Sequence, residues 1–396
     1  MKMLRFLARP AAGLPRTVII LSAGFFFVFM GASAFQQFLI PYLTDKGVTS
    51  AFQAATVLAL VYISFLVWRA VVAYTLYYLG EYWSTVLGAA TYSLFAIAAF
   101  ALNRFELLLL AAAMWGWGAA AMWISSTTQL LDATADTHYG RANGLLYTAT
   151  TGGQAIGVLL LGALMSVTSV EFGPPVAAAI TGIGVATFLF LPYQHTKRVK
   201  PRLAPIFQVL TVPRTGLAAL FLFLSSLAFG LILGSFSQII GSGQGHGMLA
   251  LITAGYWIVR IFGSYAGGFI ADWLGREQVL ILSFSVAGLG LLLPTFFGGT
   301  VTLSIAALAM GLLNSTVPVA TNAMIGDLTT FSNRHLAIAS LFVWRDLGVG
   351  IAILAGAAII SLIGSEQVIF GIFGVAFLVS AGFAYWLKGQ PVVKMA

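Results

Sequence analysis

Twelve apolar stretches follow one another along the chain, and each is long enough to cross a lipid bilayer as a helix. A bilayer-spanning helix needs about 20 mostly apolar residues. The stretches lie at 17–43, 52–78, 84–103, 107–132, 142–168, 174–193, 215–240, 248–271, 278–297, 301–327, 336–363 and 367–388. Backbone polar groups in hydrocarbon must be satisfied within the protein, which helices of this length achieve. We therefore expect an all-α membrane protein with 12 transmembrane helices and the lipid bilayer as its surroundings.

The composition supports this class and argues against several others. Only 8% of the residues are charged and 60% are hydrophobic, whereas a soluble domain carries about a quarter charged residues. Cysteine is absent, and the four His residues are scattered along the chain. Neither a P-loop nor an H-E-x-x-H or G-x-S-x-G motif is present. We expect no cofactor, no metal site and no enzyme activity.

The connectors predict how the chain is oriented. The longest one, 194–214, is basic and separates six spans (1–193) from six more (215–396). With the N-terminus in the cytoplasm, fourteen Lys and Arg residues fall on the cytoplasmic side and two, Lys46 and Arg104, on the other. The net charge of +8 is then a topology signal, and no nucleic-acid partner is expected. Both termini should be cytoplasmic, and the short loops suit a prokaryotic inner membrane.

The two halves of the chain repeat each other. The segment 140–162 aligns with 333–355, and "AYTLYYLGE" (73–81) aligns with "GFIADWLGR" (268–276). Both alignments join corresponding spans of the two halves. Parallel six-span repeats are one known transporter architecture. The sequence therefore predicts two pseudo-symmetric six-helix bundles, 1–193 and 215–396, joined by a basic cytoplasmic linker at 194–214.

A signature after the eighth span carries a family resemblance. The segment 268–276 contains Gly268, Asp272, Gly275 and Arg276. In this position the pattern resembles the signature of the major facilitator superfamily, and the span count, the repeat and the central basic loop extend the resemblance over nearly the whole chain. The resemblance implies alternating access, in which two bundles rock about a central site.

The resemblance also implies a gate at the cytoplasmic side. Asp272 would face the N-terminal end of the fifth span, and Arg276 would pair with Asp327 at the end of the tenth. The first copy of the signature is eroded, because Tyr77 stands in place of the Asp and Glu81 in place of the Arg. The alternative is a tight cytoplasmic turn with an arginine that only sets topology.

Polar residues at membrane depth are the candidate site residues. Ionisable groups there are costly and usually mark function or a structural pair. The substrate-binding candidates are Gln36, Gln37, Trp115, Gln154, Arg260, Asn314 and Arg345. The family fold places the second span beside the eleventh and the fifth beside the eighth, which predicts the pairs Arg69–Asp346 and Gln154–Arg260. The first pair could also carry proton coupling. Static intramembrane contacts, and plain packing of Trp115, are the alternatives.

These features together favour a secondary active transporter. Arginines outnumber acids at membrane depth, which favours a small, polar or anionic organic solute. This solute would move by alternating access, coupled to protons. One alternative is proton-coupled efflux of amphipathic compounds. Another is a transporter-like membrane receptor or assembly component that does not transport. The expected partner is a small-molecule substrate, and the expected state is a monomer.

Overall fold

The computed structural model describes residues 13–47, 49–135, 138–193, 213–328 and 334–388 of the chain. The predicted linker at 194–214 falls almost wholly outside these residues. All regular structure in the described residues is helical.

The helices follow the predicted spans closely. Their bounds are α2 Arg16–Val28, η1 Phe29–Ser33, η2 Gln36–Phe38, α3 Leu39–Asp45, α4 Ala51–Ala101, α5 Phe105–Ala133, α6 Tyr139–Val167, η4 Val170–Phe172, α7 Gly173–Phe188, α9 Pro213–Leu233, α10 Ser235–Gln244, α11 His246–Leu274, α12 Arg276–Phe296, α13 Thr300–Leu328, α14 Arg334–Ile363 and α15 Glu366–Lys388. The first predicted span corresponds to α2 through α3, and the seventh to α9 with α10.

Helix α4 contains two spans joined at one glycine. Its 51 residues would extend about 77 Å if continuous, more than twice the hydrocarbon core. Gly80 breaks it with φ 71° and ψ 169°. Within the described residues, eleven helical stretches are long and apolar enough to cross a membrane. Since α4 counts twice, the twelve predicted spans are confirmed, and the chain is an integral multi-pass membrane protein.

The glycine turns confirm the internal repeat. Gly275 separates α11 from α12 with φ 94° and ψ 151°, close to the conformation of Gly80. These are the two glycines that the sequence alignment superposes. A positive φ is readily adopted only by glycine, so the turn glycine is the part of the repeat that the backbone requires.

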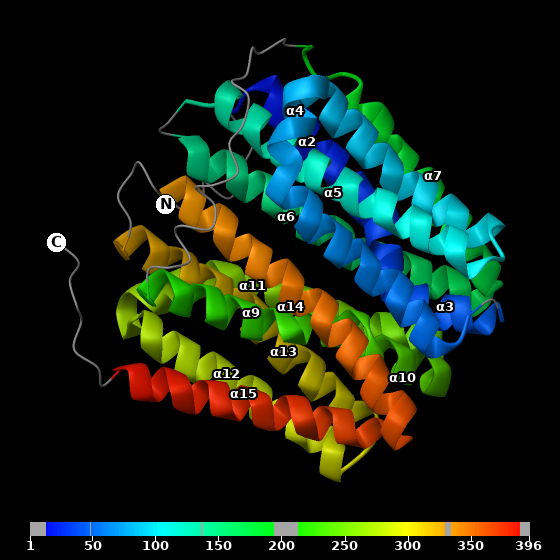
Figure 1. The fold of residues 1–396 in the computed structure, drawn as a ribbon, viewed down its shortest axis with the longest axis vertical. Coiled ribbons are helices and arrows are strands. Elements are labelled where there is room, and N and C mark those ends of the chain that lie inside the picture. The colour runs from blue at the N-terminus through cyan, green and yellow to red at the C-terminus, as the bar shows by residue number, and fades with distance from the viewer. Residues whose placement is uncertain (1–12, 48, 136–137, 194–212, 329–333, 389–396) are drawn as a thin grey trace. The chain divides into compact units, whose positions relative to one another are not determined.

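The chain forms two compact units. Unit 1 contains Met1–Gln36 and Val67–Pro201, and unit 2 contains Gln37–Leu66 and Arg202–Ala396. Within unit 2, α12 lies alongside α15 and α9 alongside α14 (Figure 1). The unit boundaries therefore fall inside the first two spans. Whether the segments 1–193 and 215–396 move as bundles stays a prediction.

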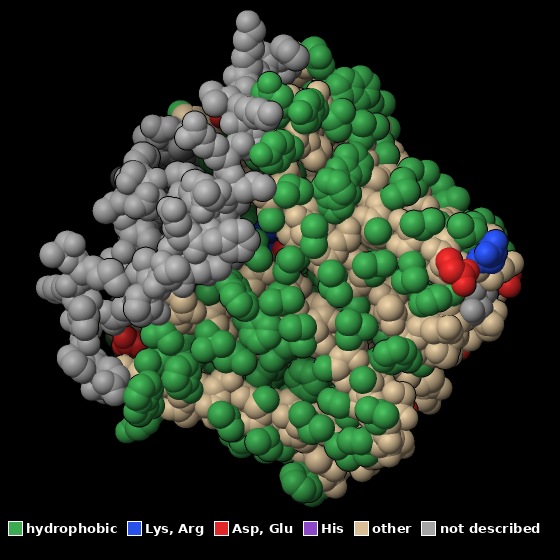
Figure 2. Space-filling view, in the orientation of Figure 1, with side chains coloured by type: hydrophobic (Ala, Val, Ile, Leu, Met, Phe, Trp, Pro, Cys, Tyr) green, Lys and Arg blue, Asp and Glu red, His purple; other side chains and the backbone are tan. Residues whose placement is uncertain are grey.

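Large apolar side chains cover much of the surface. Figure 2 shows a face on which hydrophobic side chains predominate and charged ones are few. Leu110, Phe262 and Leu362 are examples, with exposed fractions of 63%, 69% and 85%. Apolar surface on this scale would be a liability in water and is expected against lipid.

The first and seventh spans are both broken at a glycine. Gly31 has φ −90° and ψ −110°, and Gly234 has φ −89° and ψ −109°. Such breaks release backbone groups from the helical ladder, and in transporters discontinuous helices border the binding site. The two breaks repeat the pseudo-symmetry of the chain at membrane depth.

Candidate functional site

Arg260 lies at the centre of α11 and on its protein-facing side. It is 14 residues from each end of His246–Leu274, which at 1.5 Å per residue is about 21 Å. Leu251, Ile258 and Phe262 are exposed apolar residues of this helix. At about 100° per residue, Leu251 lies about 180° from Arg260, and the other two lie about 200° away. The half-buried Arg260 therefore points away from the surface expected to meet lipid.

Two aromatic rings hold the guanidinium of Arg260. Its Cζ lies 5.2 Å from the ring centroid of Phe229 on α9 and 5.1 Å from that of Trp257 on α11. Tyr62 packs edge-on against Phe229 at 6.1 Å. Cation–π contacts of this kind are stronger when water is excluded. No carboxylate among the described residues pairs with Arg260.

Arg345 differs from Arg260 because it has an acid. Its Nη2 and Nε donate to Asp346 Oδ1 at 2.7 and 3.0 Å, and its Cζ lies 4.8 Å from the Phe342 ring. Asp346 is fully buried. Neighbours on a helix point about 100° apart, yet the long arginine side chain folds back to its own neighbour. Among the described residues of unit 2, an acid thus pairs with Arg345 and none pairs with Arg260.

Gln37 binds the backbone at the break in the seventh span. Its Nε2 donates to the Ile232 carbonyl at 2.8 Å and to the Ser237 hydroxyl. The Ser237 hydroxyl donates to the same carbonyl at 2.7 Å. Gln37 is fully buried. Its predicted role in substrate binding remains untested, but its amide N–H groups already serve this structural task.

Gln154 performs a similar task at the break in the first span. Its Nε2 donates to the Ser33 carbonyl at 3.0 Å, and the Ala32 N–H donates to the Thr181 hydroxyl at 2.7 Å. Gln36 Nε2 donates to the Ser33 hydroxyl at 3.4 Å. The first two of these bonds are made to backbone groups next to the break at Gly31.

Trp115 and Asn314 are both buried within their own units. Trp115 is fully buried and packs against Tyr92 and Phe95, with ring centroids 5.1 and 4.5 Å away. Asn314 donates through Nδ2 to the Met310 carbonyl at 3.2 Å, one turn back on α13. Asn314 is also 14 residues from each end of its helix, the same depth as Arg260 in α11.

The predicted pairs between spans stay predictions. Arg69 belongs to unit 1 and Asp346 to unit 2, and Gln154 and Arg260 are divided in the same way. Arg69 is half-buried in the first of the two spans of α4, 11 residues before Gly80.

The predicted gate is described only in part. Gly268 lies in α11, Gly275 forms the turn, and Arg276 begins α12 half-buried. The side chains of Asp272 and Asp327 lie outside the described residues, so gating stays a prediction.

The eroded copy of the signature has its own surroundings. Glu81 is buried, at 3% exposure, beside a cavity of about 20 Å³ that Gln129 and Asp132 also line. Gln129 Nε2 donates to the Glu81 carbonyl at 3.2 Å. Tyr77 and Trp83 are exposed. The glycine turn is retained in this copy, but the residues around it are acidic and aromatic.

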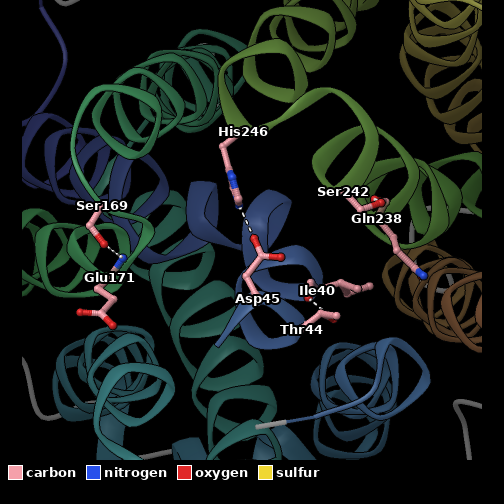
Figure 3. A network of polar contacts seen from close by, with 8 residues as sticks. All are labelled: Ile40, Thr44, Asp45, Ser169, Glu171, Gln238, Ser242 and His246. Carbon is pink, nitrogen blue, oxygen red and sulfur yellow. Dashed lines mark hydrogen bonds and ion pairs between the residues drawn. The ribbon is translucent and has the colours of Figure 1, made fainter. Parts of the chain in front are cut away.

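The sequence did not predict a polar contact between the end of α3 and the start of α11. Asp45 at the end of α3 lies 3.7 Å from His246 at the start of α11, as Figure 3 shows. The Phe38 ring stacks on His246 with centroids 6.1 Å apart. The same view shows Ser169, whose hydroxyl accepts from the Glu171 N–H and caps η4.

Sequence reasoning also missed the residues that surround Arg260 and the helix breaks. Phe229, Trp257, Thr181 and Ser237 were not candidates because apolar and hydroxyl residues are ordinary in spans. The glycines at the breaks were the available signal, since isolated glycines near the middle of a span can mark an interruption.

A protein-family model matches the chain over nearly its whole length. The family model described as Major Facilitator Superfamily matches residues 21–249 and 218–395. No curated protein matches the chain in sequence.

Solved structures share its fold. A crystal structure of the nucleoside transporter NupG superposes with a TM-score of 0.77 at 12% identity, and a mutant of that protein with 0.78 at 14% identity. Each comparison covers 95% of this chain and 100% of the other. At this identity the likeness shows the fold alone.

Proposed function

The chain belongs to the major facilitator superfamily, and from this premise we propose that it is a secondary active transporter of a small anionic or polar organic solute. It works by alternating access and is driven by protons. The observation that carries the choice of solute is that Arg260, on the protein-facing side of α11, has no carboxylate partner among the described residues. Proteins retain unpaired ionisable groups at membrane depth chiefly along substrate or ion pathways.

Proton coupling rests on Asp346. This carboxylate is fully buried and accepts two bonds from Arg345. Protonation would remove its negative charge and weaken its hold on the Arg345 guanidinium, because charge-assisted hydrogen bonds are the stronger kind. The Arg345–Asp346 contact would then be the point at which a proton acts on α14.

A nucleoside is the second candidate solute. Two solved structures of the same fold are of a nucleoside transporter. The rings of Phe229 and Trp257 favour this candidate, because aromatic faces stack on planar bases. A neutral nucleoside would not balance the positive charge of Arg260, so the nucleoside is the second candidate. Efflux of amphipathic compounds and a receptor role remain alternatives.

The orientation follows from the charge distribution of the sequence. Fourteen positive residues against two favour cytoplasmic termini. The protein would act as a monomer in a prokaryotic inner membrane and would not bind nucleic acid.

Uptake into proteoliposomes tests the proposal. The purified protein is reconstituted and supplied with organic anions, nucleosides and amphipathic cations, with and without an imposed pH gradient. Uptake of an anion should be stimulated by the gradient, and Asp346→Asn should remove the stimulation. Arg104→Gln is the matched control, because Arg104 lies outside the spans with a side chain 74% exposed.

Two results would contradict the proposal. Transport confined to neutral nucleosides would make the second candidate correct. Gradient-driven uptake that survives Asp346→Asn would refute the coupling role of Asp346. The absence of flux for every solute, in a protein that still binds one of them, would favour a receptor.

A further inference from the structure

The surroundings of Arg260 define the solute more closely than its charge alone. We infer that Arg260 and Phe229 together bind an organic acid that carries one carboxylate and a flat apolar or aromatic body. This inference rests on the proposed function and names the substrate class of the same site.

The guanidinium is held in place before any ligand arrives. Phe229 and Trp257 contact it at 5.2 and 5.1 Å, so its orientation is fixed by packing rather than by an acid. A planar guanidinium presents its N–H donors in a fixed fork that matches a carboxylate. Since no carboxylate of the described residues takes these donors, a ligand carboxylate can.

The Trp257 ring that contacts Arg260 carries a further hydrogen-bond donor. Trp257 is 4% exposed, and its indole N–H has no hydrogen-bond acceptor in the described part of the chain. A buried donor without a partner costs about 1–3 kcal/mol, so structures usually satisfy it. An acceptor on the ligand would satisfy it on binding.

The charge count favours one carboxylate over a dianion. Of the two arginines deep in the spans of unit 2, Arg345 is already neutralised by Asp346. Arg260 therefore supplies one positive charge within its unit. A monocarboxylate balances that charge, whereas a phosphate ester would carry about one charge more.

The neighbouring surface favours a flat apolar body. Phe229 is only partly buried, and Tyr62 packs against it edge-on at 6.1 Å. A ring next to the ligand carboxylate would extend this aromatic cluster, and aromatic pairs favour edge-on or offset contacts. Acetate has the charge but no such body and should bind more weakly.

Equilibrium binding to the purified full-length protein tests the inference without transport. Benzoate and phenylacetate are the probes, benzamide and phenylacetamide are their uncharged counterparts, and acetate and inorganic phosphate are the other anions. Calorimetry gives the affinity of each, in detergent at constant salt. The ring-bearing carboxylates should bind best.

Variants separate the carboxylate from the ring. Arg260→Gln should weaken benzoate about 10- to 100-fold, as expected for a lost bond to a charged group. Arg260→Lys keeps the positive charge but lacks the paired donors of a guanidinium, so it should weaken benzoate binding less than Arg260→Gln does. Phe229→Leu should weaken benzoate and leave acetate unchanged. Arg104→Gln should alter none of these affinities, and thermal unfolding checks that each variant is folded.

The outcomes are distinct from those of the transport assay. Benzamide binding as tightly as benzoate, or benzoate binding that Arg260→Gln leaves unchanged, would overturn the inference. So would wild-type protein that binds none of the carboxylates or prefers phosphate. In each of these cases the uptake panel still decides the proposed function, because it contains neutral and cationic solutes.

Discussion

The breaks at Gly31 and Gly234 have nearly the same backbone conformation but different supports. At Gly31 the freed groups bind side chains from two other helices of unit 1, Thr181 of α7 and Gln154 of α6. At Gly234 the freed carbonyl of Ile232 binds Ser237 of the same span and Gln37 of the first span.

The difference shows which part of the repeat is conserved within this molecule. The interruption is repeated, whereas the side chains that satisfy it are not. A break can be maintained by any donor in reach, because the requirement is to satisfy backbone groups in a medium without water. The first break is supported from outside its span, and the seventh partly from inside.

Gly31→Ala should have the largest effect and would show how tightly the first break is packed. A Cβ there would meet the Thr181 hydroxyl and the Ala177 carbonyl, and would lie 2.7 Å from the Thr181 backbone nitrogen. Backbone atoms cannot move aside cheaply, so we expect a loss of about 3 kcal/mol in the free energy of unfolding. Denaturant unfolding in detergent measures it.

Two further glycines serve as comparisons for Gly31. Gly234→Ala should lower the free energy of unfolding less than Gly31→Ala does, because its Cβ would lie 2.9 Å from the Gly230 carbonyl. Gly182→Ala on α7 should be nearly neutral, since nothing lies within 4 Å. Equal losses at Gly31 and Gly234 would mean that the two breaks are packed equally tightly, which would contradict the expected difference between them.

Gln37→Leu should have the next largest effect and would separate the two kinds of support. It removes two hydrogen bonds, one to the Ile232 carbonyl and one to Ser237. At about 0.6–1.7 kcal/mol for an interhelical bond in a membrane, a loss of about 2 kcal/mol is expected. Thermal unfolding measures it. Gln367→Leu is the control, because Gln367 is exposed.

Thr181→Val should cost about 1 kcal/mol. It has nearly the same shape but removes the acceptor of the Ala32 N–H. Thr181→Ser keeps the hydroxyl and should retain this bond. If valine and serine lower the unfolding temperature equally, the hydroxyl does not support the break and lost packing explains the effect.

Ser237→Ala should have the smallest effect, below about 0.6 kcal/mol. The Ile232 carbonyl still accepts from Gln37 at 2.8 Å after the change. A double variant with Gln37→Leu should lose more than the sum of the single changes, because only then is the carbonyl unsatisfied. A strictly additive result would mean that the two donors act independently.

The sequence predicted the spans and the turns because both leave local signals. Hydropathy alone places the ends of most spans within a few residues of the helix ends, and the repeat identifies Gly80 and Gly275 as equivalent turn positions. A span requires an apolar stretch long enough to cross the bilayer, and each turn requires a glycine at positive φ. Both requirements can be read from a short piece of sequence.

The contacts within the candidate site left no comparable signal. The Arg345–Asp346 bond depends on how a long side chain folds back, and the rings about Arg260 come from α9 and α11. Gln37 and Gln154 are polar at depth, as the sequence shows, but their acceptors are backbone carbonyls freed by breaks that hydropathy does not register. The contacts of these two amides could therefore be assigned only from the structure.

The membership of Gln37–Leu66 in unit 2 bears on how the gene can be divided. A chain cut within 194–214 would give a C-terminal fragment without Gln37, so the Ile232 carbonyl would keep only Ser237. Such a fragment should be degraded when synthesised alone and rescued when the N-terminal fragment is synthesised in the same cell. The two halves could then be encoded by separate genes, but the C-terminal half would fold stably only together with the N-terminal half.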